Sequence, residues 1–121
     1  MAAEQIERTQ WASFLDNVTK SLIGKRAEIE VASLDLGAQI EVEWAPLIGM
    51  TYDSKDDLIE IALEGLDHLI RSPRELFVDF GVGDIVAIAI ADGDGNRQVV
   101  KLKDPLALTA PSVAPSPDST R

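Results

Sequence analysis

Ile85-Val86-Ala87-Ile88-Ala89-Ile90-Ala91 is the one segment of this sequence that is apolar on both faces of an extended strand. Alternation divides it into a mostly methyl-sized face and a bulky face, formed by Ile85, Ala87, Ala89 and Ala91 and by Val86, Ile88 and Ile90. A strand that is apolar on both sides is typical of the centre of a sheet. The rest of the chain must therefore supply a cover for each face.

Turns bound this segment on both sides. Gly81-Val82-Gly83-Asp84 precedes it, and Asp92-Gly93-Asp94-Gly95-Asn96 follows it. The segments beyond these turns, Glu75 to Val82 and Arg97 to Lys103, alternate between apolar and polar residues. Because turns of hairpin length join antiparallel neighbours, the three strands are predicted to form a meander.

A period of two also predicts strands in the preceding part of the chain. They run from Arg26 to Val31, from Ala38 to Trp44, from Leu47 to Tyr52, from Leu58 to Glu64 and from Leu66 to Arg71. Pro46 is predicted to end the second of them, because proline lacks the donor that a ladder needs. We expect Val86, Ile88 and Ile90 to meet Ile40, Val42, Ile59 and Ile61 in the core.

A helical period is convincing in only one stretch. Trp11, Phe14, Leu15, Val18 and Leu22 fall on one stripe of a helix. Thr9 is its expected N-cap, and Gly24 is expected just beyond its C-terminus. Alanine side chains permit close approach, so we predict that the stripe packs on the methyl-sized face of Ile85 to Ala91.

The predicted fold class is α+β and mainly β, with an N-terminal helix packed on a bent antiparallel sheet or small barrel of six to seven strands. Residues 1–105 are expected to form a single globular domain in which residues 1–7 are frayed. Residues 106–121 are rich in Pro, Ser and Ala and have almost no bulky side chains, so we expect a disordered tail.

Composition excludes several classes of site and partner. The chain has 121 residues, no cysteine and one histidine, which excludes disulfides and thiolate chemistry and leaves little for imidazole metal sites. Its formal net charge of −10 would repel nucleic acid and anionic membranes. No apolar run approaches the length of a membrane span, so a cytoplasmic protein without nucleic-acid or membrane partners is expected.

Three short motifs together resemble a family of small uncharacterised bacterial proteins that is classed as a domain of unknown function. They are Arg8-Thr9-Gln10-Trp11 with Phe14-Leu15-Asp16, Leu36-Gly37-Ala38-Gln39-Ile40-Glu41, and Ala45-Pro46-Leu47-Ile48-Gly49-Met50. The resemblance covers roughly residues 6–103 and implies a bacterial cytosolic protein. It implies no activity and no functional residues.

Two glycine-containing motifs are better explained as turns than as ligand sites. Asp92-Gly93-Asp94-Gly95-Asn96 resembles the start of a calcium loop, but the twelfth position is Lys103 instead of glutamate, and both flanks are predicted strands. Gly81-Val82-Gly83 follows a strand as a nucleotide-binding glycine pair would, but a strand follows it where a helix is required.

The remaining polar candidates have equally plain explanations. His68 and Asp67 are neighbours in a strand and point to opposite faces, and neither Ser33 nor Ser72 lies in a nucleophile motif. Glu41 and Glu43 share a face that alternation already makes solvent-facing. Asp53, Asp56 and Asp57 form a polar turn that could bind Mg²⁺ only weakly. Trp11 and Trp44 lie on apolar faces and are expected in the core.

The sequence therefore predicts no catalytic, cofactor-binding or metal-binding residue, and no cofactor. We expect a non-enzymatic domain that acts through self-association as a homo-oligomer or through another protein partner. The alternative is a β-barrel that binds a small ligand in an apolar interior. A hydrolase or a metal-binding protein that uses the carboxylates is a third and weaker hypothesis.

Overall fold

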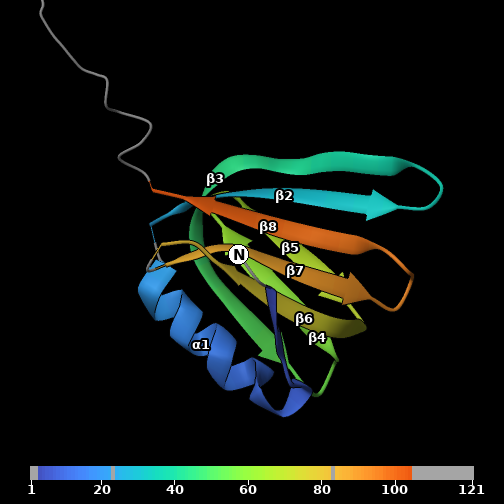
Figure 1. Cartoon of the computed structure of the whole chain (residues 1–121), viewed down its shortest axis with the longest axis horizontal. Coiled ribbons are helices and arrows are strands. Elements are labelled where there is room, and N and C mark those ends of the chain that lie inside the picture. Colours follow the sequence, from blue (N-terminus) through green and yellow to red (C-terminus); the bar gives the residue numbers. More distant parts are fainter. Residues whose placement is uncertain (1–2, 23, 83, 105–121) are drawn as a thin grey trace, which may run out of the picture.

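The structure, a computed structural model, describes residues 3–22, 24–82 and 84–104 (Figure 1). The elements, in chain order, are β1 (Ala3–Ile6), the short 3-10 helix η1 (Arg8–Gln10), α1 (Trp11–Leu22), β2 (Arg26–Ser33), β3 (Gly37–Asp53), β4 (Leu58–Leu63), β5 (Leu66–Arg71), β6 (Pro73–Phe80), β7 (Ile85–Asp92) and β8 (Arg97–Lys103). This content confirms the predicted class, α+β and mainly β. The predicted tail, residues 106–121, lies outside the described residues.

The strands form one antiparallel sheet in the order β1-β6-β7-β8-β2-β3-β4-β5. It has eight strands, so the predicted number of six to seven is wrong. Residues 1–7 were expected to fray, but Ala3–Ile6 pairs with β6, which begins far along the chain. A segment of four residues is too short to show a period and is fixed only by its partner. Within the described residues no pairing joins the edge strands β1 and β5, so these strands form an open sheet and not a closed barrel.

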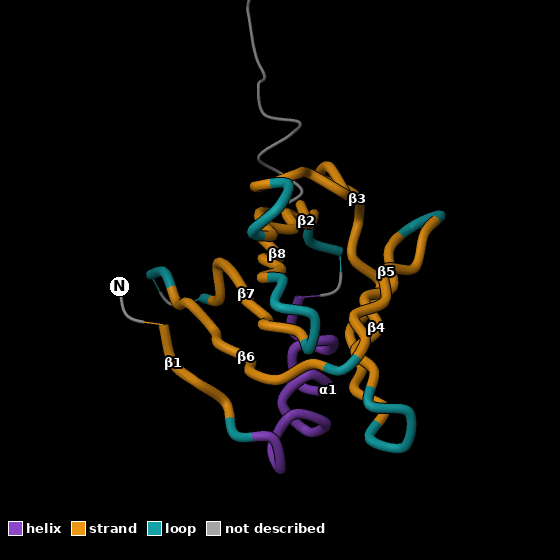
Figure 2. Tube along the Cα trace, turned by 90° about the vertical axis from the view of Figure 1, so that its right-hand side faces the viewer, coloured by secondary structure: helices purple, strands orange, loops and turns teal. Residues whose placement is uncertain are grey.

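Strand β3 folds the sheet into two layers. Pro46 does not end it: the strand continues, but it exchanges its partner β2 for β4 near this point. Trp44 has a left-handed backbone, with φ of 48°, and its carbonyl accepts a 3.0 Å hydrogen bond from the Arg26 guanidinium. The ladder is therefore interrupted at the bend, where a residue without an N–H is tolerated. Figure 2 shows β4 and β5 on one side of this bend and β6, β7 and β8 on the other.

The core lies between these layers. Ile88 and Ile90 of β7 are fully buried together with Ile59 and Ile61 of β4, as predicted. Val42 is buried too. Two expected core residues are exposed: Ile40 by 51% and Val86 by 37%. They were wrongly predicted because alternation identifies a face but does not tell where along a strand the opposite layer ends.

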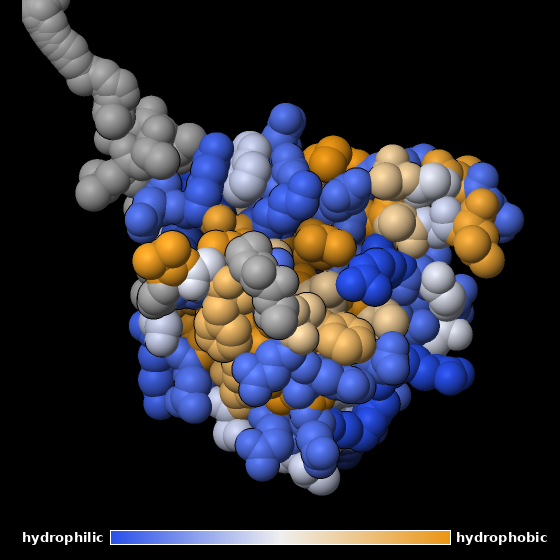
Figure 3. Space-filling model, in the orientation of Figure 1, coloured by the Kyte–Doolittle hydropathy of each residue, from blue (hydrophilic) through white to orange (hydrophobic). Residues whose placement is uncertain are grey.

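The predicted stripe of α1 is confirmed, but its predicted seat is wrong. Trp11, Leu15, Val18 and Leu22 are buried, with Phe14 half-buried. The helix packs mainly on β3 and lies at one side of the two layers (Figure 2). The alanines of β7 instead lie half-buried on the outer face of the sheet, where Figure 3 shows pale apolar atoms over the middle of the molecule. Small side chains permit a helix to approach, but they provide little area to attract one.

The ends of α1 give one confirmed and one wrong prediction. Gly24 has φ of 90°, as expected for a residue that ends a helix in the left-handed region. Thr9 is not the N-cap, because it lies inside η1. Glu7 precedes η1 and makes no capping hydrogen bond with its side chain. The helical turn therefore begins earlier than the hydroxyl residue that seemed to mark its start.

Candidate functional site

Side chains of α1 form hydrogen bonds with the backbone of one residue at each of two sheet edges. At β1, the indole Nε1 of Trp11 donates to the carbonyl oxygen of Ile6 over 2.8 Å. At the second half of β3, which β2 has left, the hydroxyl of Thr19 accepts from the Met50 N–H at 2.8 Å and lies 2.9 Å from the Met50 carbonyl oxygen. Gly49 allows this contact, because a Cβ there would lie 3.1 Å from Cγ2 of Thr19. Backbone groups that would otherwise be open to another strand are thus occupied.

Strand β5 is an edge that nothing in the described chain covers; the first half of β3, which pairs with β2 alone, is another. Strand β5 pairs with β4 on one side only. A two-residue turn joins Leu63 to Leu66, so these two residues form a hydrogen-bonded pair, and the pattern then alternates along the ladder. Asp67, Leu69 and Arg71 consequently direct their N–H and C=O groups away from β4. The uncovered edge thus offers three residues with both a donor and an acceptor.

The outward-facing side chains of β5 are exposed and partly apolar. Leu69 is 42% exposed and lies between the exposed residues Asp67 and Arg71, while Leu66 at the strand's start is 48% exposed. Among the described residues, Asp67 and Arg71 have no ion-pair partner. Two of the three outward side chains are charged, which limits indiscriminate pairing, and the edge contains neither proline nor lysine.

The inner face of β5 is fixed to the opposite layer by a polar chain that sequence reasoning missed. His68 Nε2 lies 2.6 Å from the side-chain oxygen of Gln98 on β8. The amide nitrogen of Gln98 donates to the buried carboxylate of Asp92 over 3.0 Å. Asp67 points to the other face, so it does not orient His68, as predicted. These hydrogen-bonded side chains hold β5 against β8 and keep the edge strand in a fixed position.

The same carboxylate organises the turn after β7. Asp92 Oδ1 accepts from the backbone N–H groups of Asp94 and Asn96, both at 3.0 Å, and Gly95 has φ of 86°. This confirms the predicted hairpin turn. Sequence reasoning did not identify Asp92 as a buried residue, because its position in an Asp-Gly turn indicated exposure.

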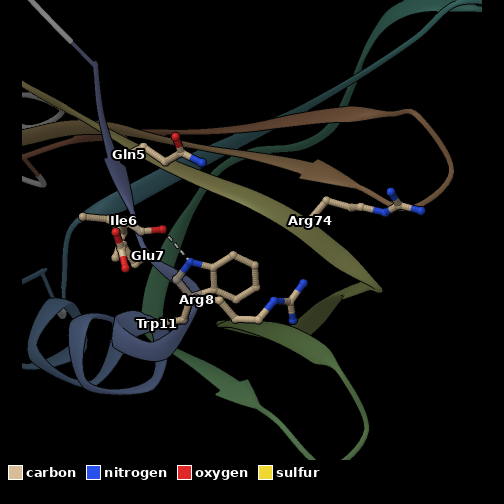
Figure 4. A pocket seen from close by; sticks show the side chains of 6 residues that line it. All are labelled: Gln5, Ile6, Glu7, Arg8, Trp11 and Arg74. Atoms are coloured by element: carbon tan, nitrogen blue, oxygen red, sulfur yellow. Dashed lines mark hydrogen bonds between the residues drawn. The ribbon is translucent and has the colours of Figure 1, made fainter.

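Arg8 is the centre of a polar cluster, and Figure 4 shows its side chain beside Trp11. Its guanidinium stacks over Trp11 at 4.5 Å from the ring centroid and donates to the Tyr52 hydroxyl, the Asp57 carboxylate and the Pro73 carbonyl at 2.9, 3.1 and 2.7 Å. Tyr52 also donates to Asp57 over 2.9 Å. Hydrogen bonds from Tyr52 and Arg8 lower the pKa of Asp57, while burial, followed by the neighbouring Asp57, raises the pKa of Tyr52.

This Arg8 cluster fixes a corner of the backbone. Asp57 and Ser72 both have a left-handed backbone, with φ of 51° and 52°, and the Ser72 N–H donates to the Asp57 carbonyl over 2.9 Å. Two surface depressions of about 340 and 500 Å³ flank Arg8, and Arg74 lines the smaller one (Figure 4). Because Arg8 directs its hydrogen bonds to protein acceptors, we interpret the cluster as a structural clamp.

The other candidates have local structural roles or remain on the surface. Asp53 accepts from the N–H groups of Lys55 and Asp56, whereas Asp57 points toward Arg8. Within the described part of the chain, no three His, Asp or Glu side chains are grouped so that they could hold a metal ion.

The remaining sequence candidates include one error. Glu41 and Glu43 are exposed, as predicted. The Gly81 N–H donates to Asp84 in a turn, and Gly83 lies outside the described residues. Trp11 is in the core, but the same prediction for Trp44 is wrong: this ring is half-buried, with the Lys103 ammonium 4.0 Å from its centroid. The left-handed bulge at Trp44 turns it out of the alternation on which that prediction depended.

Comparison with known proteins identifies a family and a relative, neither of which has a stated activity. The family of unknown function DUF5335 has a sequence model that matches residues 2–111. An uncharacterized protein of Aquifex aeolicus (strain VF5) is 38% identical over 109 residues, which cover 89% of this chain and 98% of the relative. No solved structure matches. No helix in the described ranges is long and apolar enough to cross a membrane.

Proposed function

Because this chain belongs to DUF5335, a family of unknown function, we propose a function from its own structure. In this proposal the protein is a non-enzymatic protein-interaction module that binds its partner by strand addition at β5. The observation that carries the proposal is the uncovered edge of β5, where three residues direct backbone donors and acceptors outward beside the exposed Leu69. Main-chain pairing of this kind provides affinity, and the alternating side chains provide specificity.

The treatment of the other edges supports this proposal. An uncovered strand edge is a hazard that proteins commonly protect. Here Trp11 and Thr19 occupy backbone groups of Ile6 in β1 and Met50 in β3, but the described residues give no such contact to the edge of β5. The first half of β3 is open too, but only β5 combines an open edge with opposite charges on either side of an exposed leucine. The contact between His68 and Gln98 also fixes β5 in advance, so a partner strand would meet an ordered edge.

The non-enzymatic part of the proposal is supported by the polar clusters. Arg8, Asp57 and Asp92 direct their hydrogen bonds to protein groups that hold corners and turns. The alternative of a ligand-binding barrel has less support, because buried side chains occupy the space between the layers and the depressions lie at the surface.

Site-specific photo-crosslinking in cells that produce the full-length protein tests the proposal. A photoreactive residue at Leu69 should give a discrete covalent adduct. The same residue at Asp16, which is exposed on α1, is the matched control and should give none. The absence of a discrete adduct from position 69, or the same adducts from both positions, would show that β5 is not the docking element.

A further inference from the structure

We propose that the partner strand at β5 is the β5 of a second copy of this chain, added antiparallel about a twofold axis at Leu69. This inference rests on the proposed function and names its partner. Strand β5 has six residues, and the central pairs of this arrangement, from Asp67 to Arg71, lie within them.

The backbone restricts how two such edges can pair. Only Asp67, Leu69 and Arg71 direct their N–H and C=O groups outward, and in an antiparallel ladder outward groups must lie opposite outward groups. Leu69 can therefore face Leu69, Asp67 or Arg71 of the other copy. A shift by one residue would place outward groups opposite groups that are already bonded to β4.

The side chains select among these three registers. With Leu69 opposite Leu69, Asp67 of each copy lies opposite Arg71 of the other, and the two leucines meet at the centre. Opposite charges and apolar pairs at directly facing positions stabilise a sheet. Either shifted register instead places a charged residue opposite Leu69. The strand is thus complementary to itself in one register only.

The exposure of these residues agrees with this arrangement. Alternation places Asp67, Leu69 and Arg71 on the same outward face, and the described chain provides no ion-pair partner for either charge. The net charge of −10 on each copy opposes association. We therefore expect a dimer that forms at high protein concentration and dissociates on dilution.

Charge exchange across the axis tests the register with the full-length chain. In sedimentation velocity, Asp67→Arg and Arg71→Asp should each weaken dimerisation about tenfold, because each places like charges opposite one another at two symmetric pairs. The double variant should restore the dissociation constant to about that of the wild type, because it exchanges the charges and keeps both ion pairs. Circular dichroism of each variant checks that the fold is retained.

A disulfide offers an independent measurement. The chain has no cysteine, so Leu69→Cys introduces only one thiol. Facing residues of a hydrogen-bonded pair have Cα atoms about 5.5 Å apart, which suits a disulfide. Leu69→Cys should therefore oxidise to a covalent dimer, while the control Leu66→Cys, which does not lie opposite itself, should remain monomeric.

The outcomes separate this inference from the proposed function. A monomer at millimolar concentration, or a dimer that neither charge variant weakens, overturns the second copy as partner. A Leu69 photo-adduct whose mass differs from that of two copies would likewise overturn it and leave strand addition intact. If position 69 gives no adduct at all, the proposed function itself fails.

Discussion

The strand edges next to α1 and the edge of β5 both contain backbone N–H and C=O groups that lack a strand partner. The two regions differ in what lies against these groups. At β1 and β3, the buried Trp11 and the half-buried Thr19 of α1 each bond to a backbone group that lacks a strand partner. At β5, an exposed leucine lies between two opposite charges, beside backbone groups that point outward. The difference indicates that stability is concentrated on the helix side, whereas β5 remains available for recognition.

The largest expected effect is on the covered side. Leu15→Ala should destabilise the protein by about 2–5 kcal/mol, because Leu15 is fully buried on the inner face of α1 and its truncation leaves a cavity. Leu69→Ala on β5 should change the free energy of unfolding by about 0.5 kcal/mol or less in dilute protein. Urea titration at low micromolar concentration measures both. Equal losses would mean that the two regions do not differ in stability.

A smaller effect is expected from the edge bond alone. Thr19→Val keeps the shape of the side chain but leaves the Met50 N–H and C=O without their partner, which should cost about 1–3 kcal/mol. Thr19→Ser keeps the hydroxyl and should lose less stability than Thr19→Val. The same urea titration applies. If the serine variant is as unstable as the valine variant, the methyl contact with Gly49 matters more than cover of the β3 edge.

The Arg8 clamp should make the helix side sensitive to acid. Because the folded-state pKa of Asp57 is lowered, its contribution is fully present above the unfolded pKa, about 3.9, and is lost as the pH falls through the folded value. Asp57→Asn should therefore flatten the loss of stability between neutral and acidic pH. Asp67→Asn on β5 is the control, measured by urea midpoints in dilute protein. A retained acid dependence in Asp57→Asn would exclude this carboxylate as its source.

The smallest effect is expected on the outer face of β7. Ala89→Leu should change stability by no more than about 0.5 kcal/mol, because the side chain points away from both the core and α1. Thermal and urea melts measure it. A loss above about 1 kcal/mol would indicate overpacking, as expected if another element packs on this face.

Local patterns in the sequence predicted most of the elements and the neighbours within the meander of β6, β7 and β8, which are confirmed, but not where the other elements pack. The alternation around Ile88 and the stripe through Leu15 are properties of short segments, and both are confirmed. The packing site of α1 on β3 follows from the exchange of partners along this strand, which no local pattern records. The resemblance to an uncharacterised family is also confirmed, since the family model matches residues 2–111.

The candidate site shows the same limit. Leu66 to Arg71 was predicted as a strand, but its place at the edge follows from the complete strand order. Arg8 stands in one of the family-like motifs, yet its partners Tyr52 and Pro73 lie 44 and 65 residues away. His68 and Gln98 are likewise distant in sequence. Contacts of this kind require the fold before they can be seen.

The pairing of β1 with β6 determines when the N-terminus can reach its native position. Ala3 lies opposite Asp79, so β1 has no partner until β6 has been synthesised. Closing so long a loop is slow compared with forming the neighbouring hairpins. We therefore expect β1 to be among the last elements to join the sheet.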